Sequence, residues 1–152
     1  MFFIMILLNL ITRKSDYGLF SATLPDDEIR AISSIGLAHL GDAVYELLVR
    51  TWLCVRGKVT GKSLHRATIA IVCATKQAEL SEIILPLLTE EEHNVFRRGR
   101  NANVHTIPHS ANRAEYQAAT ALESLFGWLY LRGERERINE LFSIMMEGYD
   151  AA

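Results

Sequence analysis

Apolar residues recur at spacings of three and four along most of this chain, from Pro25 onward. Within residues 33–55, for example, Leu40, Val44 and Leu47 fall on one side of a helix. No stretch alternates apolar and polar residues for long enough to indicate a β-strand. The pattern therefore predicts an all-α protein.

The length of the chain favours a single domain. It has 152 residues, of which 49% are hydrophobic and 22% are charged. A domain of about 150 residues buries roughly 70% of its unfolded surface, which is enough for a core without disulfides or a structural metal. The two cysteines, Cys54 and Cys73, form no CxxC pair and have apolar neighbours. We expect both to be reduced and buried in an intracellular protein.

Capping signals mark the expected helix starts. A helix is predicted to begin at Ser33 or Ser34, and Ser63 is the expected N-cap of another. Thr89 and Glu92 have the spacing of a capping box, in which each side chain accepts a hydrogen bond from the backbone of the other residue. The chain is therefore predicted to be a succession of separate helices.

The segment Met1–Ile11 is almost wholly apolar but too short to cross a bilayer, which needs about 20 residues. Arg13 and Lys14 follow this segment instead of preceding it, which is unlike a secretory signal. A membrane-surface anchor is the alternative, although we expect no membrane association. The expected division of the chain is an accessory segment at 1–24, a helical domain at 25–147 and a tail at 148–152.

Two acids stand four residues apart in the segment 33–55. Asp42 and Glu46 would project from one helical face, near His39. A solvated acidic face is the simple interpretation, but the neighbours of Asp42 are apolar. Gly41 lowers helix stability by roughly 1 kcal/mol, which makes a closely packed turn a reasonable expectation there.

Glu123 is a lone acid between Ala118 and Gly127, among small and apolar residues. A buried carboxylate is costly unless it is hydrogen-bonded, paired with an arginine or bound to a cation. Two carboxylates on separate helices suit Mg²⁺, which takes few protein oxygens and keeps several waters. An internal pair with an arginine is the alternative.

Three arginines within four residues form the most basic stretch: Arg97, Arg98 and Arg100, followed by Asn101. Residues 97–108 lose helical periodicity, so we expect a loop that ends where Ser110 opens a long helix. Such a loop could contact phosphates and sugar hydroxyls. The alternative is a helix C-terminus whose arginines complement the helix dipole. The net charge of −2 does not decide between them, because basic residues can gather on one face.

Four motifs in sequence order resemble those of ribonuclease III domains. The segment Leu37-Ala-His-Leu-Gly-Asp-Ala-Val-Tyr-Glu46 is similar to the signature helix of that family. The others are Leu64-His65 with its following helix, Leu88–Glu92 leading into Arg97–Ala102, and Tyr116–Leu131. The resemblance covers about residues 29–141 and extends to the Mini-ribonuclease III branch.

The resemblance implies an all-helical homodimeric endonuclease that cleaves double-stranded RNA with Mg²⁺. It places Asp42 and Glu123 at the metal as catalytic residues. Ala38 and Thr120 stand where full-length ribonuclease III enzymes usually have further acids, as is typical of the Mini branch, so one well-held Mg²⁺ is expected. The role of Glu46 stays open between orienting waters and stabilising the helix.

The resemblance also implies a substrate and a compartment. The branch matures the ends of the large-subunit (23S) ribosomal RNA precursor, which implies a cytoplasmic or stromal enzyme. Without a separate double-stranded RNA-binding domain, the catalytic domain would grip RNA unaided, so the resemblance favours RNA contact by Arg97, Arg98, Arg100 and Asn101. The alternatives are a catalytically silent RNA-binding or ribosome-associated module and, more remotely, a membrane-tethered helical interaction protein.

Overall fold

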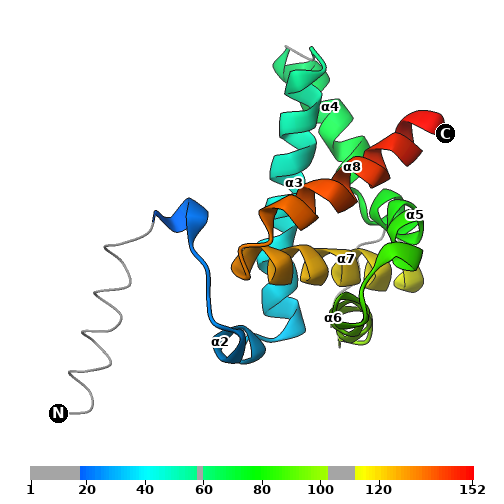
Figure 1. Ribbon diagram of the computed structural model, residues 1–152. Coiled ribbons are helices and arrows are strands. Elements are labelled where there is room, and N and C mark those ends of the chain that lie inside the picture. Colours follow the sequence, from blue (N-terminus) through cyan, green and yellow to red (C-terminus); the bar gives the residue numbers. More distant parts are fainter. Residues whose placement is uncertain (1–17, 58–59, 103–111) are drawn as a thin grey trace.

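The computed structural model describes residues 18–57, 60–102 and 112–152, and within these ranges it contains helices and no strands. The predicted all-α class is confirmed (Figure 1). The elements are η1 (Leu19–Ser21), α2 (Asp26–Arg30), α3 (Ser34–Val55), α4 (Gly61–Val72), α5 (Ala74–Ile84), η2 (Leu85–Leu87), α6 (Glu90–Arg100), α7 (Arg113–Leu131) and α8 (Arg135–Ala151).

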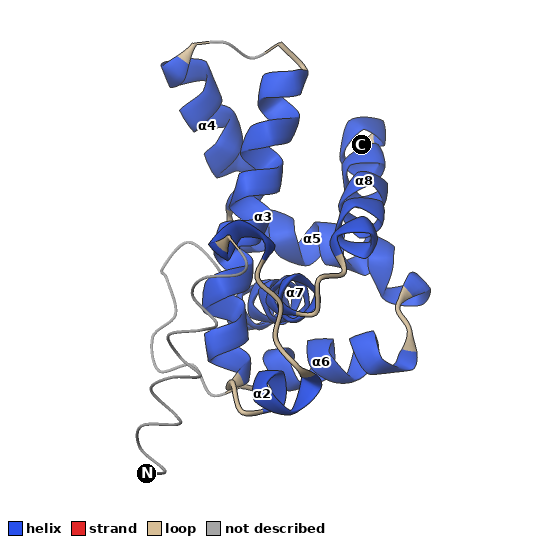
Figure 2. Cartoon of the chain, turned by 60° about the vertical axis from the view of Figure 1, so that its left-hand side comes forward, coloured by secondary structure: helices blue, strands red, loops and turns tan. Residues whose placement is uncertain are grey.

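Helix α7 lies at the centre of the fold. Figure 2 shows it nearly end-on, with α3, α5, α6 and α8 arranged around it, and it packs against all four. Its side chains Leu122, Leu125 and Phe126 are fully buried. The ring of Tyr45 on α3 meets Phe126 edge-on, with 5.8 Å between ring centroids. Each such side chain contributes roughly 1.5–3 kcal/mol by burial, so the core forms around α7.

Two glycines let α3 and α7 cross at backbone contact. A Cβ atom on Gly41 would lie 1.6 Å from the carbonyl oxygen of Glu123, and one on Gly127 would lie 2.0 Å from the carbonyl oxygen of Leu37. Any larger residue at either position would force the helices apart. The expected close packing at Gly41 is confirmed, and it brings the next residue, Asp42, beside α7.

Two predicted helix starts are confirmed. The Ser33 hydroxyl accepts a hydrogen bond from the Gly36 N–H (3.0 Å), so α3 begins at Ser34. Thr89 and Glu92 form the expected capping box at the start of α6. Glu92 also accepts from Arg137 on α8 (2.8 Å), which ties the two helices together.

Other boundaries differ from the expectation. Helix α4 begins at Gly61, because Thr60 and not Ser63 is its N-cap. Helix α6 continues to Arg100, so the predicted loop is wrong for residues 97–100, and its remainder from 103 lies outside the described residues. Ser110 also lies outside them, and α7 is capped by Asn112.

The prediction that the cysteines are buried is wrong, since Cys54 and Cys73 are both exposed. Cys54 lies on the solvent side of α3 near its C-terminal end, and Cys73 forms the corner between α4 and α5. No helix among the described residues is long and apolar enough to cross a membrane. The segment Met1–Ile11 lies outside the described residues.

Candidate functional site

The structure brings Asp42 and Glu123 together, from α3 and α7, at the crossing set by Gly41 and Gly127. Burial raises the pKa of Glu123 to about 7, a hydrogen bond from Gln77 opposes that shift, and the negative charge of Asp42 adds to it. Asp42 is close enough to Glu123 to make its ionisation harder. The pair is therefore a site that would gain from a bound cation.

Asp42 has a more open setting than Glu123. Its residue is exposed, but partial desolvation raises the pKa of its carboxyl group, and the charge of Glu46 raises it further. An electrostatic interaction with His39 lowers that pKa. Asp42 thus lies at the outer edge of the acidic pair, and Glu123 lies deeper.

Gln77 on α5 holds the carboxylate of Glu123 in place. Its side-chain amide donates to Glu123 Oε1 (3.0 Å) and to the carbonyl of Val72 (2.9 Å), and the residue is only 2% exposed. Sequence reasoning missed this residue. The sequence did contain a sign of its burial. Gln77 precedes the buried Leu80 and Ser81 by three and four residues, which places it on the same side of α5.

Tyr45 lies on α3, one helical turn after Gly41 and Asp42, and close enough to Glu123 to be affected by its charge. Its hydroxyl is buried and has no hydrogen-bond partner among the described residues. Burial is the main cause that raises the pKa of Tyr45, and electrostatic interactions with Cys73 and Glu123 raise it further. The tyrosine therefore stays neutral and places a buried polar atom near Glu123.

Glu46 is engaged along its own helix. It accepts a hydrogen bond from Arg50 Nε (2.7 Å), four residues further along α3. Of the two roles left open for Glu46, this contact favours the one of stabilising the helix.

The donor set suits a hard cation with few protein ligands. Among the described residues, no group of three or more histidine, cysteine or acidic side chains is placed to hold a metal. The hydroxyl of Thr120 donates to the Tyr116 carbonyl (3.0 Å), and Ala38 has no donor. The carboxylates of Asp42 and Glu123 are then the candidate protein ligands. Two carboxylates suit Mg²⁺, which keeps several waters, and are too few for a site in which the protein supplies every ligand.

The basic stretch does not form one cluster. Arg97 donates to the side chain of Asn94 (2.8 Å), whereas Arg98 lines a cavity beside α2 and α7. Arg100 lines a different groove, at the start of α7. Asn101 is the C-cap of α6. The last turn of α6 therefore points these side chains in different directions.

Comparison with known proteins decides the family. A model of the ribonuclease III domain matches residues 36–134, which include Asp42, Glu123 and the crossing between α3 and α7. The chain belongs to the ribonuclease III family. The expectation of a ribonuclease III-type endoribonuclease is thereby confirmed.

The relatives agree with this assignment over most of the chain. The Mini-ribonuclease 3 of Symbiobacterium thermophilum is 50% identical over 105 residues, which cover 69% of this chain and 81% of that protein. The Mini-ribonuclease 3 of Synechocystis sp. is 41% identical over 138 residues (89% and 94%). A crystal structure of a Fusobacterium nucleatum protein matches with a TM-score of 0.73 and 33% identity, covering 80% of this chain and 98% of that one.

Proposed function

We propose that this chain cleaves double-stranded RNA with the help of Mg²⁺, which Asp42 and Glu123 hold. The observation that carries the proposal is the acidic pair at the glycine crossing, where burial and the charge of Asp42 hold the pKa of Glu123 near 7. A protein gains nothing in stability from two such carboxylates side by side. Their cost is offset when a divalent cation binds between them.

The side chains around the site have distinct tasks. When bound, Mg²⁺ supplies positive charge that stabilises the phosphate undergoing hydrolysis and assists the attacking water. Glu123 presents a fixed carboxylate, because Gln77 holds one of its oxygens. Asp42, at the exposed edge, leaves its carboxylate accessible from solvent, where RNA would approach.

The RNA would be held through its backbone. Arg97, Arg98, Arg100 and Asn101 are exposed at the end of α6 and are the RNA-binding residues of this proposal. The described residues place no acidic partner on these three arginines. Guanidinium groups without acidic partners are suited to phosphate contacts, and A-form duplexes are recognised mainly through phosphates and 2′-hydroxyls.

The proposal extends to the assembly and the substrate. We place the enzyme in the cytoplasm as a homodimer that matures the ends of the 23S ribosomal RNA precursor. The support is the resemblance of residues 29–141 to the Mini-ribonuclease III branch, together with relatives of that name that match 69% and 89% of this chain. Sedimentation of the purified chain tests the dimer.

A cleavage assay on a double-stranded 23S precursor tests the activity. Asp42→Asn and Glu123→Gln should each reduce the rate by at least about a hundredfold, and a chelator should stop it. Glu46→Gln is the matched control, since it removes an acid from the same helix one turn away. RNA that is bound but never cut in Mg²⁺ or Mn²⁺ would support the catalytically silent module instead.

A further inference from the structure

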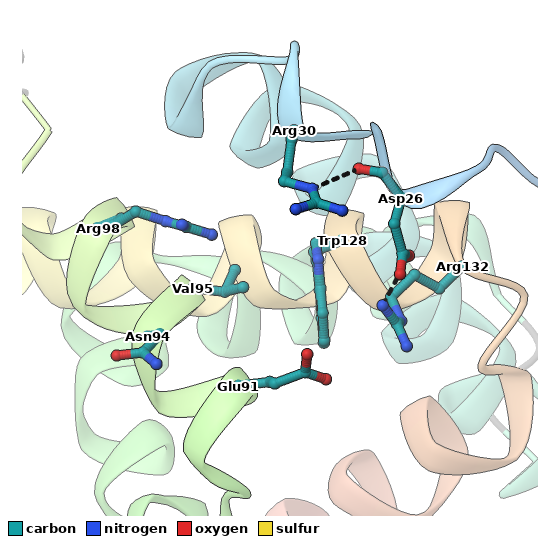
Figure 3. Close-up of a pocket in the computed structure, with 8 residues that line it drawn as sticks. All are labelled: Asp26, Arg30, Glu91, Asn94, Val95, Arg98, Trp128 and Arg132. Carbon is teal, nitrogen blue, oxygen red and sulfur yellow. Dashed lines mark hydrogen bonds and ion pairs between the residues drawn. The ribbon is translucent and has the colours of Figure 1, made fainter. Parts of the chain in front are cut away.

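A second candidate site lies away from the acidic pair. A cavity of about 220 Å³ is bounded by α2, α6 and the C-terminal part of α7 (Figure 3). Arg30, Arg98 and Trp128 also line an adjoining cavity of about 230 Å³, so these three residues stand where the two spaces meet. Neither cavity includes Asp42 or Glu123.

Two guanidinium groups have free donors at this junction. Arg98 makes no hydrogen bond or ion pair with any described residue, and Arg30 uses only its Nε, which donates to the backbone carbonyl of Asp26 (3.2 Å). Figure 3 shows both side chains directed toward the space beside Trp128. Arginine side chains whose terminal N–H groups have no partner are suited to binding phosphate through two parallel hydrogen bonds.

Asp26 and Arg132, two of the other charged residues that line the cavity, balance each other. Arg132 donates to Asp26 (2.8 Å), so this acid is paired with an arginine that lines the same cavity. The guanidinium of Arg132 also stacks on Trp128, 4.6 Å from the ring centroid. The positive charge of Arg30 and Arg98 is therefore left for a ligand.

Val95 and Trp128 line two sides of this cavity, which we call the slot. In Figure 3, Arg132 lies on one side of the indole ring, and Val95 lies across the cavity on the other side. Val95 is buried and Trp128 is half-buried. An indole face opposite an aliphatic side chain is a surface on which a nucleobase stacks.

Glu91 supplies an acceptor at the end of the slot opposite Arg30 (Figure 3). The carboxylate makes no hydrogen bond or ion pair with the described residues. A carboxylate pairs best with a base edge that offers two N–H donors side by side. Guanine offers this arrangement at N1 and N2.

We propose that this slot binds a guanosine nucleotide, with its base between Val95 and Trp128 and its phosphate on Arg30 and Arg98. The nucleotide comes either from an unpaired guanosine in bound RNA or from a free guanosine nucleotide. The RNA source rests on the proposed function, because Arg98 is also one of the RNA-binding residues named above. The free-nucleotide source does not depend on it.

Binding is measured without metal and without cleavage, so failure of the nuclease proposal leaves the readout intact. The chain has two tryptophans, and their indole N–H signals in a ¹H–¹⁵N spectrum are assigned with Trp52→Phe. Addition of guanosine 5′-monophosphate should shift the signal of Trp128 and leave that of Trp52 in place. Guanosine alone and inorganic phosphate alone should each bind at least about tenfold more weakly.

Two arginine variants distinguish binding in this cavity from nonspecific attraction of the monophosphate to positive charge. Arg30→Ala should weaken binding of the monophosphate about tenfold. Arg66→Ala removes an exposed arginine on α4, at the opposite end of α3 from α2 (Figure 1), and should have no effect. Absence of a Trp128 shift at millimolar monophosphate, or equal loss in the two variants, would overturn the proposal. A changed oligomeric state in Arg30→Ala would also overturn it, because the cavity would then be part of a protein interface.

RNA ligands identify the source of the nucleotide. A duplex with a single-stranded guanosine overhang and the matching blunt duplex are compared in chelator. A Trp128 shift with the overhang only, reversed by the monophosphate, assigns the slot to RNA. A shift with the monophosphate and with neither duplex assigns it to a free nucleotide.

Discussion

Helix α7 carries two sites of opposite character within five residues. At Glu123 it meets α3 at backbone contact, and the polar groups described there include Asp42, Glu123 and the amide of Gln77. At Trp128 a large side chain lies between α7 and its neighbours α2 and α6, beside a cavity of about 220 Å³ with two free arginines. Residue size along one helix therefore decides whether it meets its neighbour at backbone contact or leaves a cavity beside it.

The most damaging single change should be Gly41→Ala. Its methyl group would overlap the Glu123 carbonyl oxygen, so the helices must separate. We expect the free energy of unfolding to fall by about 3 kcal/mol or more, with loss of cleavage. Gly61→Ala is the control, because nothing lies within 4 Å of a Cβ at that position. Denaturant unfolding that shows equal stability for the two variants would refute the close crossing.

Glu123→Gln should stabilise the metal-free protein at high pH. The pKa of Glu123 rises from an ordinary 4.5 to about 7, mainly by burial, so the folded state holds the proton more tightly than the unfolded state. Its contribution to stability is therefore greatest at low pH and is lost as the pH rises through 7. At pH 8 the variant should be more stable by up to about 3 kcal/mol. Thermal unfolding in chelator between pH 5 and 8 measures this, and a parallel pH dependence in both proteins would contradict it.

Gln77→Ala should weaken metal binding by about tenfold, because Glu123 loses the group that orients its carboxylate. Ser81→Ala is the control. It removes another buried polar side chain of α5, whose hydroxyl donates only to the Ala78 carbonyl (2.8 Å). Titration of both variants with Mn²⁺ tests the prediction, and equal affinities would remove Gln77 from the site.

Asp26→Ala should have the smallest effect. It breaks the ion pair with Arg132, whose partners are 58% and 25% exposed. Exposed pairs contribute less than about 1 kcal/mol, and the helices remain fixed by the α3–α7 crossing. Chemical denaturation of the variant checks this. A larger loss would mean that the rim of the cavity supports the fold.

Features encoded within a few residues were predictable from the sequence. The cap at Ser33 and the capping box of Thr89 and Glu92 depend on near neighbours in the chain, and the low helix propensity of Gly41 was the local sign of its close packing. The contact of Gln77 with Glu123 joins residues 46 positions apart, and no local pattern encodes that distance.

The end of α6 and the cavity beside it were missed for related reasons. The acidic first turn, the capping box and the packing against α7 carry α6 through Gly99, despite the low helix propensity of glycine. The cavity depends on how α2 packs across α7, which only the folded structure specifies. Asp42 and Glu123 were singled out because acids are rare in such apolar stretches and because both match the ribonuclease III motifs.

Metal binding by the acidic pair is the central claim, and calorimetric titration of the purified chain with Mg²⁺ tests it most directly. We expect one ion per chain, with affinity at least about tenfold weaker in Asp42→Asn and in Glu123→Gln and unchanged in Glu46→Gln. Undiminished binding in either of the first two variants would contradict the assignment of these carboxylates to the metal.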